Sequence, residues 1–302
     1  MFQDQNFEEL TVIIVTYKTN KEILYECITS IDNKIKIIIV ENGNDISLKN
    51  EIENKFKNIK VILSEKNLGY GGGNNLGCKH VKTRYVFISN PDTIYTEKFF
   101  LNVKNYIKLN INFNIIGASY PSHDEYLPYG GFSNKSTEIY KTKSYDTNDL
   151  KDVDWVVGCS MLIDLKNLKM NNLFDENIFF FYDETDLCRR IKNSGGIVLN
   201  SKRLIVNHLG QKSSIGSMKN KKLEAEKFRN WHLMWSEFYY HKKHNSFIFA
   251  FHKVFGKLIR SLFKMIFFLI TNNKEKKIIY QYRFFGLINS ILGKKSWYRI
   301  EK

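Results

Sequence analysis

The sequence predicts an α/β fold, a mostly parallel sheet with helices on both faces, followed by an amphipathic helical region at the C-terminus. The main observation is that short β-branched apolar runs alternate with segments of helical periodicity over the first 120 residues. The composition agrees, because 43% hydrophobic residues and only 3 Pro exclude a wholly disordered or collagen-like chain. In such sheets, ligands gather at the carboxyl ends of the strands.

The elements follow one another in a regular order. Strands are expected at residues 10–16, 35–40, 61–63, 85–89 and 115–120. Helices are expected at residues 21–31, at 47–56 with Ser47 as N-cap, from a Gly-rich turn at 69–73 to about 81, and at 97–109. A polar insertion at 121–150 is followed by ordered chain at 153–164, a helix from about Glu184 to Ser194, strands at 197–199 and 204–208, and helical chain beyond 219.

Charge divides the chain into two parts. Residues 1–200 carry 24 Lys and Arg against 26 Asp and Glu, whereas residues 201–302 carry 22 against 5. A strongly basic tail indicates contact with an anionic surface.

The four cysteines form no C-x-x-C pair, which favours reduced thiols in a cytosolic protein. The acidic, polar start predicts no signal peptide, and the absence of a 20-residue apolar run predicts no spanning helix.

Polar residues and glycines follow the ends of successive predicted strands. They are Thr16 and Tyr17, Glu41 and Asn42, the run NLGYGGGNNLG at 67–77, and Asn90-Pro91-Asp92. Glu41 could accept the imide N–H of a uracil or thymine base, and Asp92 offers the hard oxygen that a divalent cation requires beside a diphosphate. Each could alone be a turn former, and the glycine run lacks the lysine of a P-loop. Their recurrence on successive strand ends favours a ligand site.

Three carboxylates in four residues, Asp183, Glu184 and Asp186, follow the aromatic run at 179–182. Like-charge repulsion in such a cluster raises at least one carboxyl pKa, which suits a general base. The alternative is an acidic first helical turn favoured by the helix dipole, with Arg189 and Arg190 as ordinary partners. A lone histidine such as His208 is more often structural, so a structural role and a metal or diphosphate contact both stay open.

These residues, in this order, resemble the family-two inverting glycosyltransferases of the GT-A fold, and among them the rhamnosyltransferase branch of surface-polysaccharide assembly. The similarity spans roughly residues 10–245. It rests on VIIVTYK (12–18), IIIVENGN (37–44), NLGYGGGNNLG (67–77), FISNPDT (87–93), DWVVGCSMLI (154–163), FFFYDETDLCRRI (179–191), NHLGQKSS (207–214) and RNWHLMWSEFYYHKKH (229–244). It implies a GT-A catalytic domain at 1–218, with a Rossmann-like nucleotide-sugar-binding part at 10–120 and an acceptor part at 121–218, before a helical region at 219–302.

The resemblance assigns roles to single positions. Nucleotide-sugar-binding residues would be Thr16, Tyr17, Glu41, Asn42, Gly69, Gly71, Asn74, Asn75, Asn90 and Gly158. Asp92 matches the metal-binding end of the family's D-x-D motif and, with His208, would hold Mg²⁺ or Mn²⁺. Glu184 would be the catalytic base, with Asp183 or Asp186 orienting the acceptor.

Three positions depart from the family's pattern. Asn90 replaces the first carboxylate of D-x-D, which implies weaker metal binding. The acidic pair is Asp183-Glu184 where Glu-Asp is commoner, and Glu41 stands where Asp is usual. These changes bear on the metal, the base and the nucleotide contact in turn.

The function that the resemblance implies is inverting transfer of a sugar from a nucleoside-diphosphate sugar to a hydroxyl of a glycan acceptor. A lipid-linked acceptor in O-antigen, capsule or lipooligosaccharide assembly is expected, with dTDP-rhamnose as the first donor. A UDP-hexose (galactose, glucose or N-acetylhexosamine) is the alternative donor. The alternative without enzymatic activity is an inactive scaffold with a polyanion-binding tail, against which the retained acidic cluster argues.

The tail has an amphipathic pattern. Its basic stripe is Lys253, Lys257, Arg260 and Lys264, and the opposite apolar side is Phe251, Phe255, Leu258, Ile259, Leu262, Ile266 and Leu269. This pattern is typical of a helix in a membrane interface rather than of a nucleic-acid-binding element. A packed helix with a solvated basic face is the alternative. Residues 245–302 are therefore expected to meet an anionic membrane, with the protein cytoplasmic and peripheral on the inner face of the cytoplasmic membrane, and no nucleic acid is expected as a partner.

Overall fold

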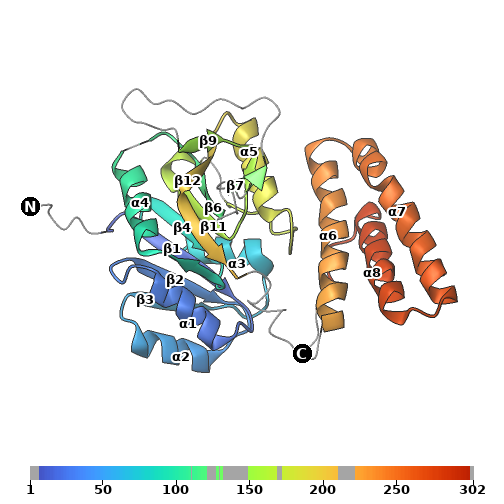
Figure 1. The fold of residues 1–302 in the computed structure, drawn as a ribbon, viewed down its shortest axis with the longest axis horizontal. Coiled ribbons are helices and arrows are strands. Elements are labelled where there is room, and N and C mark those ends of the chain that lie inside the picture. Colours follow the sequence, from blue (N-terminus) through green and yellow to red (C-terminus); the bar gives the residue numbers. More distant parts are fainter. Residues whose placement is uncertain are drawn as a thin grey trace, which may run out of the picture. The chain divides into compact units, whose positions relative to one another are not determined.

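The computed structural model describes residues 7–109, 111–120, 127, 128, 130, 131, 149–168, 172–209 and 222–299 (Figure 1). Most of the polar insertion expected at 121–150, and residues 210–214 after His208, lie outside these residues. The chain forms two compact units. The first comprises Met1–Phe174 and Glu184–Ser217, and the second comprises Asp175–Asp183 and Met218–Lys302.

The first unit is built on a sheet with the strand order β3-β2-β1-β4-β11-β6-β12-β5. Its strands are β1 (Leu10–Thr16), β2 (Lys36–Glu41), β3 (Ile59–Leu63), β4 (Tyr85–Ser89), β5 (Thr93–Tyr95), β6 (Ile115–Tyr120), β11 (Ser160–Asp164) and β12 (Val198–His208), with the short β7 (Leu127–Pro128) and β9 (Leu150–Asp152) beside β6 and β12. A separate pair joins β8 (Gly130–Gly131) to β10 (Trp155–Val156). Strands β1 to β4 are parallel, and β11 runs antiparallel between β4 and β6.

This arrangement brings the ends of β1, β2 and β4 to one edge of the sheet. Glu41 lies opposite Thr16 in the register of β1 and β2. Strand β11 starts at the same edge, with Ser160 opposite Ser89. Because parallel strands share a carboxyl edge, the polar residues that follow them in the sequence converge there. The predicted mostly parallel α/β sheet is confirmed.

Helices cover both faces of the sheet (Figure 1). They are α1 (Lys21–Ser30), α2 (Ile46–Lys55), α3 (Gly69–Cys78), α4 (Glu97–Lys108) and α5 (Asp183–Asn193), and a 3₁₀ turn spans Leu165–Asn167. Along β1, Val12 and Ile14 join the core with α1, α2 and α4, whereas Ile13 joins the core with α3 and α5. Alternate side chains of a strand point to opposite faces, so one apolar strand supports two helical layers.

The expectation of a Gly-rich turn at 69–73 was wrong, because α3 already begins at Gly69. The glycines let this helix approach β1 closely. A Cβ at Gly73 would lie 2.6 Å from Val15 Cγ1, and a Cβ at Gly77 would lie 2.8 Å from Ile13 Cγ2. Close packing against the sheet thus outweighs the low helix propensity of glycine.

Two smaller expectations also needed correction. The N-cap of α2 is Asp45, whose Oδ1 accepts from Leu48 N at 2.9 Å, and not Ser47; Asp and Ser cap helices about equally well. The strands expected at 197–199 and 204–208 are one strand, β12, with an irregularity between Asn200 and Ile205.

The second unit is helical, as predicted for the chain beyond 219. Helices α6 (Lys222–His244), α7 (Phe247–Ile270) and α8 (Lys274–Ile291) pack against one another. Their shared core contains Met234, Phe238, Ala250, Val254 and Leu287. Across the described residues, none of the helices combines the length and apolarity needed to cross a bilayer.

Candidate active site

Glu41, at the end of β2, stabilises the turn that follows it through hydrogen bonds to backbone amides. Its buried carboxylate accepts hydrogen bonds from Gly43 N at 2.9 and 3.0 Å and from Asp45 N at 2.7 Å. Burial raises the pKa of Glu41, and these amide donors oppose the rise. Beside it, Asn42 N donates to Thr16 O at 2.8 Å. Half-buried Tyr17 follows, with the Lys18 ammonium 5.4 Å from its ring centroid. The turn-forming role of Glu41 is thus present, and its nucleotide contact stays a prediction.

Two buried amide oxygens lie beside the start of α3. Asn42 donates through Nδ2 to Gly69 O, and Asn74 donates through Nδ2 to Tyr70 O, each at 3.0 Å. The Oδ1 atoms of both side chains are buried and accept no hydrogen bond within the described part of the chain. An unsatisfied buried acceptor costs about 1–3 kcal/mol. Such acceptors point to a ligand that brings N–H or O–H donors.

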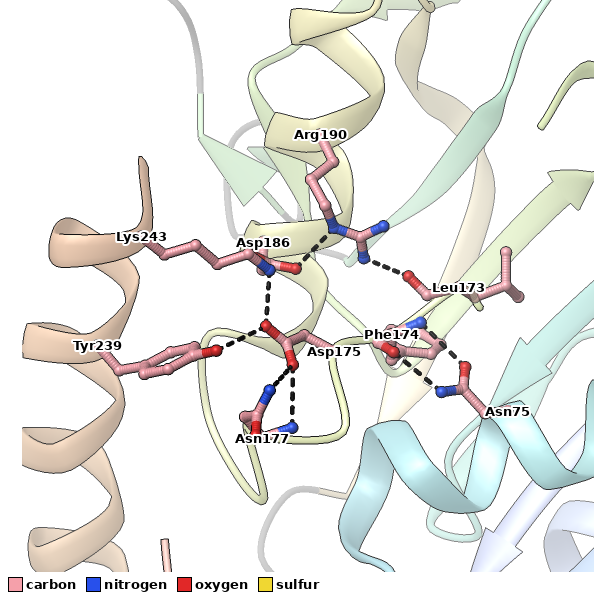
Figure 2. Close-up of polar contacts among 9 residues, drawn as sticks. All are labelled: Asn75, Leu173, Phe174, Asp175, Asn177, Asp186, Arg190, Tyr239 and Lys243. Atoms are coloured by element: carbon pink, nitrogen blue, oxygen red, sulfur yellow. Dashed lines mark hydrogen bonds and ion pairs between the residues drawn. The ribbon is translucent and has the colours of Figure 1, made fainter. Parts of the chain in front are cut away.

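Other residues expected in the nucleotide pocket are engaged inside the protein. The Asn75 amide bonds the Phe174 backbone both ways, donating to the carbonyl and accepting from the N–H at 2.9 Å each (Figure 2). Gly158 O accepts from Tyr70 Oη at 2.5 Å, and a Cβ at Gly158 would lie 2.7 Å from that hydroxyl. Gly69 has a φ of 76°, and buried Gly71 lies in the first turn of α3. These contacts fix the local backbone of the expected pocket.

Asp92 and His208 are brought together by the sheet. The pairing of β5 with β12 places His208 opposite Thr93, and Leu209 N donates to Asp92 O at 3.0 Å. Asp92 is 1% exposed, and its Oδ1 lies 3.3 Å from His208 Nε2. That oxygen accepts no hydrogen bond from the described residues. A buried carboxylate oxygen beside an imidazole nitrogen is a donor pair suited to Mg²⁺ or Mn²⁺.

The donor pair is incomplete by itself. Over the described ranges, no group of three or more His, Cys, Asp or Glu side chains could hold a metal ion. Magnesium sites commonly use one or two carboxylates and take their remaining ligands from substrate phosphates and water. Asp92 and His208 therefore fit an ion that is bound together with a diphosphate.

The acidic residues at the start of α5 have different environments. Asp183 is its first residue and is buried. Asp186 is fully buried, and its Oδ2 accepts from Arg190 Nε at 2.8 Å, while the same guanidinium donates to Leu173 O (Figure 2). Glu184 is half-buried, and burial raises the pKa of its carboxyl. Of the three, Glu184 has the environment that suits a general base.

Cys159 was not proposed as a site residue from the sequence, but its thiol is affected by the charges of Asp92 and Glu184. Burial raises the pKa of its thiol, and the negative charges of Asp92 and then Glu184 raise it further. Cys159 O also accepts from Asn90 N at 3.0 Å. The charges of Asp92 and Glu184 thus both affect the pKa of this buried thiol, and both residues belong to the first unit.

Two strained residues precede α5 and carry no sequence signal. Phe181 and Tyr182 have φ values of 65° and 67°, in the left-handed region that non-glycine residues seldom adopt. Each such residue costs about 1–3 kcal/mol and persists only where the surroundings determine it. Neither position is Gly or Asn, so no residue type at these positions indicates a left-handed conformation.

The model of the glycosyl transferase family 2 matches residues 11–168, which is more than half of the chain. The chain belongs to glycosyl transferase family 2. It is 23% identical over 304 residues to the low-salt glycan biosynthesis hexosyltransferase Agl10 of Haloferax volcanii, covering 96% of this chain and 91% of that protein. It is 24% identical over 208 residues to rhamnosyltransferase WbbL of Escherichia coli, covering 61% and 77%. The resemblance to the rhamnosyltransferase branch is confirmed.

Solved structures agree with the fold of this family. GalNAc-T7, solved with UDP, GalNAc and Mn²⁺, gives a TM-score of 0.58 at 13% identity and covers 83% of this chain, which spans only 57% of that one. The mannosyltransferase PcManGT of Pyrobaculum calidifontis, solved with GDP-Man and Mn²⁺, gives 0.55 at 12% identity, covering 95% and 88%. At such identities the likeness concerns the fold, and the expected GT-A fold is confirmed.

Proposed function

We propose that this chain transfers a hexosyl group, with inversion, from a nucleoside-diphosphate sugar to a hydroxyl of a glycan acceptor. The observation that carries the proposal is the buried carboxylate of Asp92 beside the imidazole of His208, where β5 pairs with the end of β12. Asp92 lies 3.3 Å from His208, and the charges of Asp92 and Glu184 both raise the pKa of Cys159. Membership of glycosyl transferase family 2 supports the reaction class.

The proposed base is Glu184. It takes the proton of the acceptor hydroxyl while the hydroxyl oxygen attacks the anomeric carbon. The bond from that carbon to the diphosphate oxygen breaks on the opposite side, so the configuration inverts. Burial raises the pKa of Glu184, which makes its carboxylate a stronger base than an exposed one. Asp183 or Asp186 would orient the acceptor; the Asp186–Arg190 bond holds Asp186 in place.

The diphosphate is proposed to lie beside Asp92 and His208. These two side chains would hold Mg²⁺ or Mn²⁺, and such an ion neutralises charge on the departing diphosphate when it is bound. The buried, unsatisfied Asp92 Oδ1 supports this assignment. Both solved structures described above contain Mn²⁺, which also favours a divalent ion.

The nucleotide is proposed to bind at the ends of β1 and β2 and the start of α3. Its contacts would come from Thr16, Tyr17, Glu41, Asn42, Gly69, Gly71, Asn74, Asn75, Asn90 and Gly158. The unsatisfied Oδ1 atoms of Asn42 and Asn74 support this, since base N–H and ribose O–H groups would satisfy them. The similarity to WbbL favours dTDP-rhamnose, and a UDP-hexose is the alternative.

The acceptor is proposed to be lipid-linked, at the inner face of the cytoplasmic membrane. Helix α7 supports this because it packs through Ala250, Val254 and Ser261 and exposes large apolar side chains elsewhere. Those at least 45% exposed are Phe247, Ile248, Phe255, Phe263, Ile266, Phe267, Leu269 and Ile270. Exposed apolar chains of this extent favour an interfacial helix over the packed-helix alternative.

Two details of the expected stripe change. Phe251 and Leu258, expected on the apolar face, are partly buried against the core of the three helices. Of the basic stripe, Lys253, Lys257 and Arg260 are exposed. Lys257 is paired with Glu237, and Lys264 Nζ donates to Tyr280 Oη at 3.1 Å. Lys253 and Arg260 are therefore the main cations proposed to contact anionic lipid.

A panel of nucleotide sugars tests the proposal. Each donor is added with Mn²⁺, and thermal stabilisation and transfer to a polyprenyl-diphosphate glycan are measured. A ligand at 100 times its Kd adds about 2.7 kcal/mol of stability, which a melting curve resolves. Stabilisation by dTDP-rhamnose or a UDP-hexose, followed by transfer with inverted configuration, is expected. Equal melting temperatures across the panel, without transfer from any donor, would contradict the proposal.

A further inference from the structure

The chain that leads into Glu184 belongs to the second unit. Segment Asp175–Asp183 clusters with the C-terminal helices, whereas the residues on either side of it, Phe174 and Glu184, belong to the first unit. The segment contains no strand and only the first residue of α5. It includes the left-handed Phe181 and Tyr182. Its conformation therefore depends on contacts made within the second unit.

Polar groups of α6 hold this segment at two points. Asp175 Oδ2 accepts from Tyr239 Oη at 3.0 Å and from Lys243 Nζ at 2.7 Å (Figure 2). Phe180 O accepts from Ser236 Oγ at 2.9 Å. The three donors are spaced i, i+3 and i+7, so they share one face of α6. We call Ser236, Tyr239 and Lys243 the α6 clamp.

The ion pair at Asp175 joins a largely buried carboxylate to a more exposed lysine. The side chain of Asp175 is 13% exposed and that of Lys243 is 27% exposed, so solvent screens the pair only in part. The second oxygen of Asp175 accepts from the backbone and side-chain nitrogens of Asn177 at 2.9 and 2.8 Å. Burial alone would raise the pKa of Asp175, but Lys243 and Asn177 hold it below its ordinary value. Both carboxylate oxygens of Asp175 thus accept hydrogen bonds, one from α6 and the other from Asn177 within the segment.

Aromatic packing on α6 completes the support. The ring of Phe179 lies 5.1 Å from that of His232 and 6.0 Å from that of Phe228, between centroids. The Tyr182 ring lies 5.1 Å from the Tyr240 ring. These contacts bracket the strained stretch and explain how two left-handed residues persist in it.

We propose that the α6 clamp sets the path by which the chain enters α5 and thereby positions Glu184. Ser236, Tyr239 and Lys243 are then positioning residues, which act through the peptide chain from Asp175 to Asp183. The inference rests on the proposed function, because it takes Glu184 as the base. A misplacement of about 1 Å at a reacting group costs about 10²-fold in rate, so a loosened segment lowers turnover without touching the donor.

The test compares the double variant Lys243→Met/Tyr239→Phe with the control Lys242→Met, which removes an exposed cation from the adjacent position. Lys243→Met combined with Tyr239→Phe is expected to lower kcat by about 10²-fold while the donor KM stays unchanged. Hydrogen exchange at amides 176–184 is expected to rise in the same variant and to stay unchanged in α3. Lys243→Arg keeps the cation beside Asp175 and is expected to retain most of the turnover.

Two results would overturn the clamp. One is equal kcat in the Lys243→Met/Tyr239→Phe variant and the Lys242→Met control while the wild type is active. The other is faster exchange at 176–184 with unchanged kcat, which would make the contacts merely structural. Absence of transfer by the wild type with every donor is a separate outcome, because it contradicts the proposed function itself.

Discussion

At the scale of single residues, burial separates carboxylates that look alike in the sequence. Asp183, Glu184 and Asp186 form one acidic run, yet Asp186 is paired with Arg190 and Glu184 has its pKa raised by burial. Asp186 is fully buried, and its bond to Arg190 holds the side chain in place. Glu184 is half-buried with a carboxylate destabilised by desolvation, so it gains from taking up a proton. The same contrast assigns the proposed base.

The raised pKa of Glu184 predicts a pH-dependent effect on stability. A group whose pKa is higher in the folded protein contributes full stability below its unfolded pKa and loses it as pH rises through the folded pKa. Replacing the charge by Glu184→Gln is therefore expected to raise the melting temperature at pH 8 relative to wild type. Near pH 4 the difference should largely vanish, because the wild-type carboxyl is then mostly protonated.

Differential scanning calorimetry at both pH values checks this expectation. Glu26→Gln is the matched control, because Glu26 is exposed on α1 and its replacement should leave the melting temperature nearly unchanged at either pH. A Glu184→Gln variant that melts below wild type at pH 8 would show that the carboxylate is stabilised by its surroundings, contrary to the account.

Sequence reasoning proposed Asp92, His208 and Glu184 as site residues because each stands at the end of an element, where a parallel sheet tends to bind its ligands. It could not show that Asn75 is used by the Phe174 backbone or that Glu41 bonds its own turn. Those bonds depend on loop paths rather than on periodicity. Cys159 was missed for a similar reason, since Asp92 and Glu184, whose charges raise the pKa of its thiol, come from distant parts of the chain.

At the scale of elements, α3 shows packing overriding propensity. Five of its ten residues are Gly, yet it forms a helix against β1. Gly73→Ala is expected to destabilise the first unit, because the new Cβ would lie 2.6 Å from Val15 Cγ1. Overpacking of this kind costs about 1–3 kcal/mol and exceeds the gain of about 1 kcal/mol in helix propensity.

Chemical denaturation measures this effect, with Gly256→Ala as the control. Gly256 lies inside α7 with nothing within 4 Å of an added Cβ, so alanine there should stabilise its helix by about 0.5–1 kcal/mol. Opposite signs for the two substitutions are expected. A Gly73→Ala protein at least as stable as wild type would show that α3 does not need its close approach to β1.

The alternation of strands and helices could be predicted from the sequence, because apolar residues recur about every 2 residues in a strand and every 3.6 residues in a helix. The sequence did not show which strands pair or whether they run parallel or antiparallel. Strand β11 is antiparallel to β4, and the three-residue β5 pairs with the end of β12. Periodicity reports which face of a strand is buried but not its neighbour or its direction, so the pairing that brings Asp92 to His208 had to come from the structure.

At the scale of the whole molecule, the second unit carries an exposed apolar face beside exposed cations. Vesicle flotation tests its proposed use. The full chain is expected to float with vesicles containing phosphatidylglycerol and to float poorly with pure phosphatidylcholine, since each cation near an anionic surface adds about 1 kcal/mol. Phe263→Asp, at a side chain 68% exposed on α7, should weaken flotation markedly.

Leu101→Asp is the control for that experiment. Leu101 is 55% exposed on α4 of the first unit, so its loss should leave flotation unchanged. Equal flotation of the wild type and the Phe263→Asp variant on anionic vesicles, or equal flotation on both lipids, would contradict the interfacial role of α7.

The central claim is that Asp92 and Glu184 serve one bound nucleotide sugar, the first holding its diphosphate and the second accepting the acceptor proton. Donor affinity in Mn²⁺ and single-turnover transfer, measured together on Glu184→Gln and Asp92→Asn, test it most directly. Glu184→Gln should keep wild-type donor affinity and lose transfer by about 10²–10⁴-fold, whereas Asp92→Asn should lose the Mn²⁺-dependent part of donor binding. Wild-type transfer in Glu184→Gln, or unchanged Mn²⁺-dependent affinity in Asp92→Asn, would contradict the account.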